Sequence, residues 1–384
     1  MSSANIIIFR CELMDWSETF IYAQSGHLRR YVPNYLGVRS LGQLPPPPGP
    51  CLIVNRGGWL GGLRENAFKV WNVMPGLYGQ LKRLRPALIH AHFGPDGASA
   101  VPLAGHLNVP LIVTFHGYDT AINRRNFSRY DYITRAYVRR QGRLKRKGRV
   151  FIAVSESIKK RLLEQGFPPD SVIVHYIGVD TDFFRPAAAV RREPFVLFTG
   201  RLVEKKGCEY LIKAMSGVQA ARPETRLVIA GDGALRPSLE RQAERTLRNY
   251  TFLGMQTRAE VRALMNRAKV FCVPSISSNP DGAEGFGMVF AEAQAMGLPV
   301  VSFNSGGVPE AVAHGETGFL AEEGDWEALA GNILHLMEDG QLWRRFSGNG
   351  QVRIRRHFDL ARQTVLLENI YDGVRKGFPQ GKQR

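Results

Sequence analysis

The sequence has few of the residues that build covalent or metal-bound frameworks. Its 384 residues include only four cysteines, and none of them stands in a C-x-x-C pair. No nearby histidines complete a zinc pattern. The sequence therefore predicts neither a disulfide framework nor a zinc-stabilised fold, and we expect reduced thiols packed in strands or helices.

Long apolar runs are also missing. No run reaches the roughly 18 uninterrupted apolar residues that a membrane-spanning helix needs. The first residues lead directly into the strand-like run Ile6–Phe9, without the basic start and longer apolar region that are typical of a signal peptide. We therefore expect a cytoplasmic protein.

Acidic residues are scarce relative to basic ones, and the imbalance is uneven along the chain. The whole chain has 51 Lys and Arg against 34 Asp and Glu, a formal net charge of +17. Residues 1–187 hold 25 basic and 12 acidic residues, whereas residues 188–384 hold 26 and 22. This is typical of a protein that meets nucleic acid, an anionic membrane or a phosphorylated substrate, and composition does not choose among them.

Short apolar runs alternate with longer amphipathic segments in two successive series. This alternation predicts βα units and parallel sheets. In the first series we expect strands at Asn5–Phe9, Cys51–Val54, Ala87–Ala91, Pro110–Phe115, Val150–Val154 and Val172–Tyr176, and helices at Glu18–Tyr31, Ala67–Arg83 and Ser155–Glu164. In the second we expect strands at Phe195–Phe198, Arg226–Ala230, Tyr250–Leu253, Val270–Pro274, Pro299–Phe303 and Gly318–Leu320, and helices at Gly207–Ala220, Leu235–Leu247, Arg258–Arg267 and Glu284–Met296.

The segment Arg185–Arg192 separates the two series and is the expected linker. The predicted architecture is α/β with two Rossmann-like domains, one over residues 1–187 and one over residues 188–358, facing each other across a cleft. Ligands of such sheets bind at the carboxyl ends of the strands.

The loop Thr199–Gly207 carries the first chemical signal. It follows a predicted strand and precedes a predicted helix, and its glycines allow a close approach to a ligand. Arg201 can fork two phosphate oxygens, and Lys206 adds a point charge beside a helix N-terminus. A diphosphate site fits this pattern as well as an ordinary solvated loop does.

The segment Glu284–Glu292 carries the second signal. Its two carboxylates are eight residues apart, which on a helix is little more than two turns. The amides near Gly285 and Gly287 are expected to be free, because first-turn N–H groups lack intrahelical partners. One ligand could then meet carboxylates at its hydroxyls and amides at its phosphate. Surface glutamates on an ordinary helix are the alternative, but they leave the two glycines unexplained.

Histidines end two predicted strands of the first series. His116 stands beside Gly117, and His92 lies two residues before Gly94. Both side chains could reach into the cleft, although a single histidine is more often structural. Asp180-Thr181-Asp182 resembles a D-x-D metal grip, and we interpret it as a turn. Gly231-Asp232-Gly233 mimics half of a dinucleotide fingerprint, but Arg236 occupies the position of the third glycine.

The segment Arg124–Arg149 holds eleven Lys and Arg and a single acid, Asp131. Four aromatic residues are interleaved, namely Phe127, Tyr130, Tyr132 and Tyr137. A helix here would present basic and aromatic groups on one surface, which suits an anionic membrane or a lipid phosphate. RNA binding and a plain solvated helix are the alternatives.

Taken together and in order, these motifs resemble the family 4 retaining glycosyltransferases, which have the two-domain GT-B fold. The E-x7-E element at Glu284 and Glu292 is the most specific match, joined by the G-R-L-x-x-x-K-G loop at Gly200–Gly207 and the H-G-x-D element at His116–Asp119. The resemblance covers nearly the whole chain. One departure is Trp16–Ile21, where many members carry a glycine-rich loop.

The resemblance implies roles for individual residues. Arg201 and Lys206 would hold the donor diphosphate, and Glu292 the ribose hydroxyls. Glu284 would bind the donor sugar with the backbone of Gly285, Phe286, Gly287 and Met288, and His116 would contact that sugar. The donor is a nucleotide sugar used as substrate, and no metal or other cofactor is expected. The C-terminal helix, at about 359–376, would return to the first domain.

The expected activity is retaining transfer of a hexose to a lipid-linked or saccharide acceptor in bacterial exopolysaccharide, capsule or lipopolysaccharide synthesis. The enzyme would contact an anionic membrane through residues 124–149, at the inner membrane face, and no nucleic acid is expected. A GT-B phosphorylase and a non-enzymatic basic module that binds RNA or membrane are the alternatives.

Overall fold

The computed structural model describes residues 3–15, 18–71, 76–122, 132–187, 190–277 and 282–378. The contacts divide the chain into two units, Met1–Gly178 with Leu360–Arg384, and Val179–Asp359. The division falls after Gly178, a short way before the expected boundary at residue 187. We refer to them as unit 1 and unit 2.

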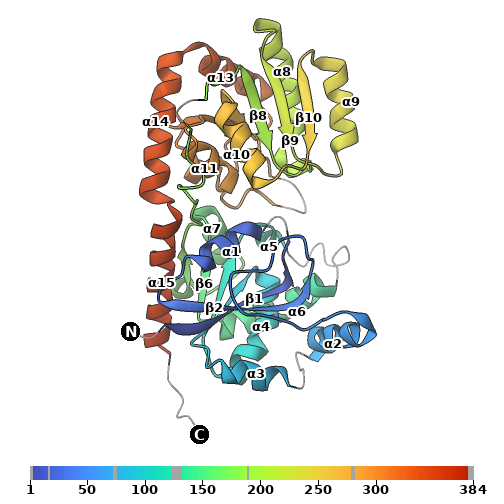
Figure 1. Ribbon diagram of the computed structural model, residues 1–384, viewed down its shortest axis with the longest axis vertical. Coiled ribbons are helices and arrows are strands. Elements are labelled where there is room, and N and C mark those ends of the chain that lie inside the picture. Colours follow the sequence, from blue (N-terminus) through green and yellow to red (C-terminus); the bar gives the residue numbers. More distant parts are fainter. Residues whose placement is uncertain are drawn as a thin grey trace. The chain divides into compact units, whose positions relative to one another are not determined.

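Unit 1 is built on a parallel sheet whose strands run in the order β3-β2-β1-β4-β5-β6-β7 (Figure 1). Its strands are β1 Ala4–Leu13, β2 Tyr31–Ser40, β3 Cys51–Ile53, β4 Ile89–His92, β5 Leu111–Phe115, β6 Val150–Ala153 and β7 Val172–Val174. Its helices are α1 Thr19–Gly26, α2 Gly58–Trp71, α3 Leu77–Arg83, α4 Gly94–Leu107, α5 Tyr118–Ala121, α6 Tyr132–Lys147, α7 Glu156–Glu164 and α15 Leu360–Lys376. The chain reverses its direction of travel across the sheet between β1 and β4, which places a ligand-binding switch point there.

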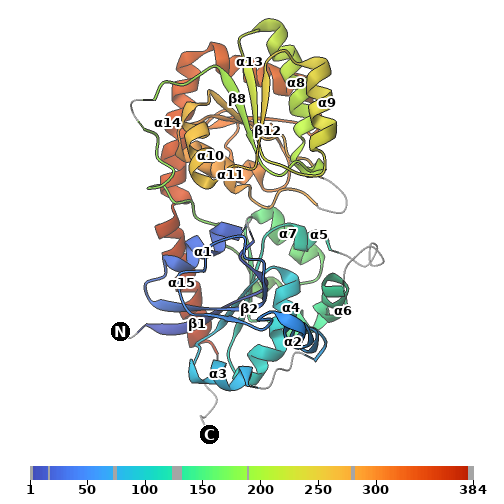
Figure 2. The ribbon, with the colours of Figure 1, turned by 45° about the vertical axis from the view of Figure 1, so that its right-hand side comes forward.

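Unit 2 repeats the same winding, with the strand order β10-β9-β8-β11-β12-β13 (Figure 2). Its strands are β8 Phe195–Thr199, β9 Arg226–Ala230, β10 Tyr250–Gly254, β11 Val270–Cys272, β12 Val300–Phe303 and β13 Gly318–Ala321. Its helices are α8 Cys208–Ala221, α9 Arg236–Thr246, α10 Arg258–Arg267, α11 Met288–Ala295, α12 Val308–Ala311, α13 Trp326–Glu338 and α14 Gly340–His357. Its switch point lies between β8 and β11.

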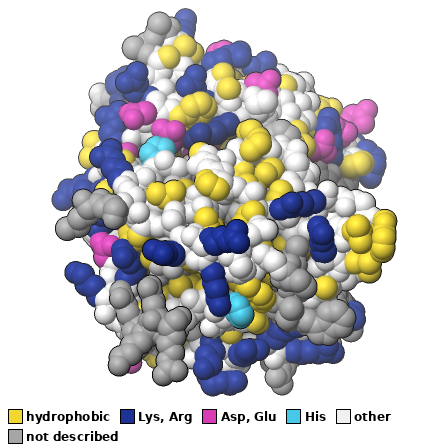
Figure 3. Space-filling model, turned by 60° about the horizontal axis from the view of Figure 1, so that its bottom comes forward, with side chains coloured by type: hydrophobic (Ala, Val, Ile, Leu, Met, Phe, Trp, Pro, Cys, Tyr) yellow, Lys and Arg dark blue, Asp and Glu magenta, His cyan; other side chains and the backbone are white. Residues whose placement is uncertain are grey.

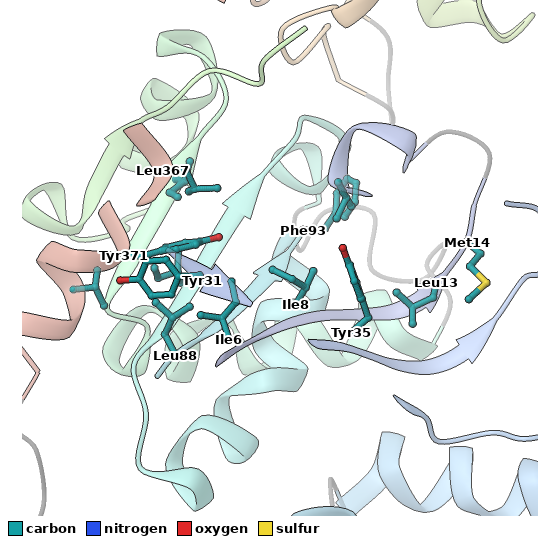
Figure 4. Packing of buried hydrophobic residues seen from close by; sticks show 14 residues of the cluster. Ile6, Ile8, Leu13, Met14, Tyr31, Tyr35, Leu88, Phe93, Leu367 and Tyr371 are labelled. Carbon is teal, nitrogen blue, oxygen red and sulfur yellow. The ribbon is translucent and has the colours of Figure 1, made fainter. Parts of the chain in front are cut away.

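The core of unit 1 joins β1 to the C-terminal helix α15. Ile6 and Ile8 of β1 pack with Leu367 and Tyr371 of α15, all of them buried (Figure 4). The Tyr371 hydroxyl lies 2.7 Å from Nδ1 of His90 on β4, so a polar contact fixes the helix as well. The last helix of the chain is therefore an integral part of the N-terminal unit.

Local sequence signals explain several helix starts. Ser155 caps α7 by accepting a hydrogen bond from the Ile158 amide at 3.1 Å. Thr257 and Glu260 form a reciprocal capping box at the start of α10. Such caps satisfy amides that the first helical turn would otherwise leave without partners.

One predicted helix was too long, and one strand was not predicted. The helix expected over Glu18–Tyr31 ends at Gly26, and the following segment forms β2, a strand that the sequence analysis missed. Pro33 and Gly37 lie within β2 and are typical strand breakers. The strand forms nevertheless, because it pairs with β1 on one side and β3 on the other.

The third correction concerns Glu284. The helix expected over Glu284–Met296 begins only at Met288, after Gly287 in a left-handed conformation with φ 80°. Glu284 therefore lies in the preceding loop, so the expected spacing of about two helical turns between Glu284 and Glu292 does not apply.

Within the described ranges, no helix is both long enough and apolar enough to cross a membrane.

Candidate active site

The carboxyl ends of the strands in unit 2 bring several predicted segments together. The Leu202 amide donates to the carbonyl of Asp232 at 2.8 Å, which ties the loop after β8 to the loop after β9. The Gly307 amide donates to the carbonyl of Glu284 at 2.9 Å, which ties the loop after β12 to the E-x7-E segment. These bonds hold the loops at the switch point of the sheet, where ligands of doubly wound folds bind.

Close packing at this edge explains one glycine of the loop Thr199–Gly207. Gly207 has φ 62°, and a Cβ there would lie 1.9 Å from the carbonyl oxygen of Pro274. A side chain at this position would therefore collide with the backbone that follows β11. This approach also draws Lys206 toward the residues after Pro274.

Lys206 and Glu284 form an ion pair at the centre of this arrangement. Nζ of Lys206 lies 2.6 Å from Oε2 of Glu284, and both side chains are largely buried. The Ser275 hydroxyl donates to the same Oε2 at 3.2 Å. Burial alone would raise the pKa of Glu284, but Lys206, Lys205 and these two hydrogen bonds lower it to about 2. The carboxylate is therefore ionised at neutral pH and accepts hydrogen bonds only.

Arg201, unlike Lys206, is not part of an ion pair in the described residues. It is exposed, and its guanidinium has no partner among the residues that the structure describes. A guanidinium without a protein partner can bind two oxygens of a ligand phosphate. Arg201 and Lys206 thus provide one free and one paired cation on the same loop.

The start of α11 offers backbone donors. The amides of Gly285, Gly287 and Met288 have no acceptor within the described part of the chain. Such amides at a helix N-terminus, together with the helix dipole, favour a bound anion. The ring of Phe286 is buried against Phe358, with centroids 5.0 Å apart, so its side chain does not face a ligand.

Glu292 lies one turn into α11 and is half-buried. Burial raises its pKa to about 7, while the charge of Arg258 acts in the opposite direction. Among the described residues it shares no hydrogen bond with Lys206 or Glu284, so the structure does not join the two glutamates in one network. Glu292 is a separate acceptor that is partly protonated near neutral pH.

In unit 1, the predicted histidines are brought together. Nδ1 of His92 lies 3.1 Å from Nε2 of His116, and the ring of Phe93 packs on His116 with centroids 4.6 Å apart. Burial holds the pKa of His116 well below its usual range, helped by the charge of Arg10 and by His90. The His116 ring is therefore neutral. Its Nδ1 is buried and has no partner among the described residues.

Asp119 fixes the turn that carries His116. Its carboxylate accepts hydrogen bonds from the amides of His116 at 3.2 Å, Gly117 at 2.9 Å and Gly94 at 3.0 Å. Burial raises its pKa to about 6, although these three amides lower it. The aspartate of the H-G-x-D element thus holds two strand ends in place and is not exposed to a ligand.

A buried charged cluster near His92 was not predicted from the sequence. Arg10 within β1 pairs with Glu18 and with Asp96, and Nη1 of Arg10 donates to the carbonyl of His92 at 3.3 Å. Its guanidinium also lies 4.4 Å from the centroid of the Phe93 ring. The available signal was Arg10 itself, because a charge that continues the apolar run Ile6–Phe9 requires a partner.

The structure gives no sign of a metal centre in the part that it describes, since no three His, Cys, Asp or Glu side chains there converge on one point.

Comparisons with known proteins match both units. The family described as "Glycosyltransferase Family 4" matches residues 23–183, and "Glycosyl transferases group 1" matches residues 180–353. An uncharacterized glycosyltransferase of Methanocaldococcus jannaschii is 30% identical over 287 residues, which are 74% of this chain and 75% of that protein. The chain belongs to glycosyltransferase family 4.

The chain is also similar to a second curated protein and to a solved structure. A putative colanic acid biosynthesis glycosyltransferase of Salmonella typhimurium is 33% identical over 63% of this chain, but the match spans only 59% of that protein. The crystal structure of Anabaena HepE in complex with UDP and glucose shares the fold, with a TM-score of 0.77 and 20% identity over 96% of this chain and 100% of that one.

The family 4 assignment and the GT-B fold predicted from the sequence are thus confirmed, and so is the expectation of a glycosyltransferase at the level of the family. The roles expected of single residues stay predictions.

Proposed function

We propose that this family 4 glycosyltransferase moves a hexose from a nucleotide-sugar donor to a lipid-linked or saccharide acceptor, with retention of the anomeric configuration. The observation that carries the proposal is the buried Lys206–Glu284 ion pair beside the free amides of α11. This arrangement provides cations and N–H donors for a diphosphate next to an ionised acceptor for sugar hydroxyls.

Donor binding would rearrange the ion pair. A diphosphate between Arg201, Lys206 and the α11 amides would draw the Lys206 ammonium away from Glu284. Glu284 would then accept hydrogen bonds from the sugar hydroxyls, while Glu292 would accept them from the ribose. While the pair is intact, Lys206 and Lys205 hold the pKa of Glu284 at about 2, so the donor would meet an ionised carboxylate.

In the transfer step, the bond between the anomeric carbon and the diphosphate oxygen breaks. The acceptor oxygen attacks from the same face, and its proton passes to the leaving diphosphate, which departs as the nucleoside diphosphate. Arg201, Lys206 and the α11 amides would stabilise the negative charge that grows on the leaving group. The neutral ring of His116 would contribute to positioning the sugar.

The pathway and the location are part of the same proposal. The Salmonella relative named for colanic acid biosynthesis supports a role in bacterial surface polysaccharide synthesis. The exposed residues Arg135, Arg139, Arg143 and Arg146 recur at helical spacing along α6, which supports peripheral contact with an anionic membrane at its inner face. Lys and Arg side chains spread over the face of unit 1 in Figure 3, and acidic ones are sparse there.

One part of the expected aromatic and basic surface is corrected. Tyr137 is buried and is not available to a membrane. Phe127, Tyr130 and the side chain of Tyr132 lie outside the described residues. Within residues 124–149, the support for membrane contact therefore comes from the exposed arginines of α6.

The proposal is tested by donor hydrolysis, which needs no acceptor. The purified protein is incubated with a panel of UDP- and GDP-hexoses, beginning with UDP-glucose because the Anabaena structure holds UDP and glucose. Release of nucleoside diphosphate from at least one donor supports the proposal. No release from any donor, together with phosphate-dependent cleavage of a glucan, would replace it with the phosphorylase alternative.

A further inference from the structure

Helix α2 buries a glutamate and exposes several large apolar residues. Gly61, Glu65 and Phe68 recur at helical spacing and form its buried face. Phe68 packs on Phe9 of β1, with ring centroids 6.2 Å apart. Glu65 accepts a hydrogen bond from the Asn55 side chain at 2.6 Å. This face fixes the helix to unit 1.

The outward side of α2 is apolar. Trp59 is 76% exposed, Leu63 is 55% exposed and Leu60 is 52% exposed. An ordinary surface helix turns its apolar stripe to the core and its polar residues to water. Here a glutamate lies inside and a tryptophan and two leucines lie outside. A cluster of large apolar side chains that face away from the core marks an interaction surface.

The charges beside this surface indicate what covers it. Arg56 and Arg64 are exposed and flank the three apolar residues, and Glu65, the one acid in the range 56–68, is buried. Figure 3 shows a group of apolar side chains at its right edge, the side on which α2 lies in Figure 1. A tryptophan with leucines and arginines, and without exposed acids, matches the boundary between lipid headgroups and acyl chains.

We propose that α2 docks unit 1 on an anionic bilayer by inserting Trp59, Leu60 and Leu63 at the headgroup boundary, with Arg56 and Arg64 on the lipid phosphates. With 14 residues α2 is too short to span the bilayer, so it lies in the interface. The inference deepens the membrane contact proposed above, since α6 supplies long-range attraction and α2 supplies insertion. It does not depend on which sugar is transferred.

The test measures binding to vesicles without donor or acceptor. The protein is sedimented with vesicles of phosphatidylglycerol and phosphatidylcholine, and with phosphatidylcholine alone. The triple variant Trp59→Ser/Leu60→Ser/Leu63→Ser is expected to bind the anionic vesicles at least about tenfold more weakly, because three side chains no longer leave water. The same vesicles should shift the tryptophan emission of the native protein to the blue. Trp59→Phe should keep the binding and lose most of the shift.

A matched control lies in the same unit. Val365 and Leu366 of α15 are also exposed, at 48% and 43%, on a helix that packs with α1 and lies on the side away from α2 in Figures 1 and 2. Val365→Ser/Leu366→Ser should bind vesicles as the native protein does, and thermal unfolding should show that both variants fold.

Three outcomes would overturn the inference: no binding of the native protein to anionic vesicles, unchanged binding of the triple variant, or equal loss in the α15 control. A fourth would assign the surface to a second copy of the chain. In that case the triple variant would dissociate a dimer in light scattering while its vesicle binding stayed native. Donor hydrolysis is measured separately, so failure here is distinguishable from failure of the proposed transferase.

Discussion

Nζ of Lys206 lies 2.6 Å from Oε2 of Glu284, and the two residues are 78 positions apart in the sequence. The pair joins the loop after β8 to the loop before α11, which are the two segments with the clearest sequence signals. One cation cannot serve a carboxylate and a diphosphate equally well. We therefore expect Lys206 to exchange Glu284 for the diphosphate when a donor binds.

Removing the cations should weaken nucleoside diphosphate binding. We expect Lys206→Ala and Arg201→Ala each to raise the Kd for the preferred nucleoside diphosphate by about 10- to 100-fold, since hydrogen bonds to charged groups contribute about 1.5–3 kcal/mol. Isothermal titration measures this. Lys213→Ala, which removes an exposed cation on α8, is the control. An unchanged Kd in both site variants would contradict the diphosphate assignment.

The low pKa of Glu284 predicts an acid-dependent contribution to stability. Its pKa is about 2 in the folded state against an ordinary 4.5, so ionisation stabilises the fold above the unfolded pKa. That contribution, on the order of 2–3 kcal/mol, is lost as pH falls from 4.5 toward 2. The native protein should therefore lose more stability than Glu284→Gln over this window in urea unfolding. Parallel acid curves for the two proteins would show that the pair does not act in this way.

Glu292 should make the pH dependence of stability run in the opposite direction. Its folded pKa of about 7 lies above the ordinary 4.5, so the charged form is disfavoured and stability is lost as pH rises from 4.5 through 7. Glu292→Gln is expected to be more stable than the native protein at about pH 8, by on the order of 1–3 kcal/mol, and to show little difference at about pH 4.5.

Nucleotide binding gives a second measure of Glu292. Ribose hydroxyls donate to an ionised carboxylate, so binding should release a proton from Glu292 near pH 6.5. Titration calorimetry in buffers of different ionisation enthalpy measures the number of protons released. The release should be absent in Glu292→Gln. Equal proton release by the variant would remove the ribose role from this residue.

His116 is expected to affect transfer more than nucleotide binding. His116→Asn should lower kcat for donor hydrolysis by about 10- to 1000-fold through the loss of one group that acts in the transition state. The Kd for nucleoside diphosphate should stay within about twofold, because the proposed diphosphate ligands belong to the loop Thr199–Gly207 and to α11. If His116→Asn lowered kcat and nucleoside diphosphate affinity to the same degree, the His92–His116 contact would instead have a structural role.

Replacing Arg10 should lower the free energy of unfolding. Arg10→Met leaves the buried carboxylates of Glu18 and Asp96 without their cation, and breaking a buried charge network in this way typically costs about 3–5 kcal/mol. Thermal and urea unfolding measure the loss. The triple variant Arg10→Met/Glu18→Gln/Asp96→Asn should recover part of it, because no uncompensated charge remains. A triple variant less stable than Arg10→Met would contradict this explanation.

Both sheets could be predicted from the sequence, because a strand that is buried on both faces is apolar along its whole length. Most predicted strands occur within a few residues of their expected bounds. It failed at β2, where Pro33 and Gly37 hide a strand that depends on pairing with β1 and β3. Local propensity does not report such long-range pairing.

The sequence also indicated residues of the candidate site. Arg201, Lys206 and Glu284 were predicted as donor-binding residues because their loops follow apolar runs and contain glycines. The contact of Lys206 with Glu284 was not predicted, because it depends on the turn before α11. Arg10, Glu18 and Asp96 were missed for a similar reason, since a buried charge is recognised only together with its partners.

The most direct test of the proposed function compares Glu284→Gln with native protein at a saturating concentration of the preferred donor. We expect kcat for nucleoside diphosphate release to fall by about 100-fold or more, while the Kd for nucleoside diphosphate stays within about threefold, because in the proposed complex Glu284 would meet the sugar and Lys206 the phosphate. Glu327→Gln, an exposed glutamate on α13, should change neither value. Native kcat in Glu284→Gln would contradict the account.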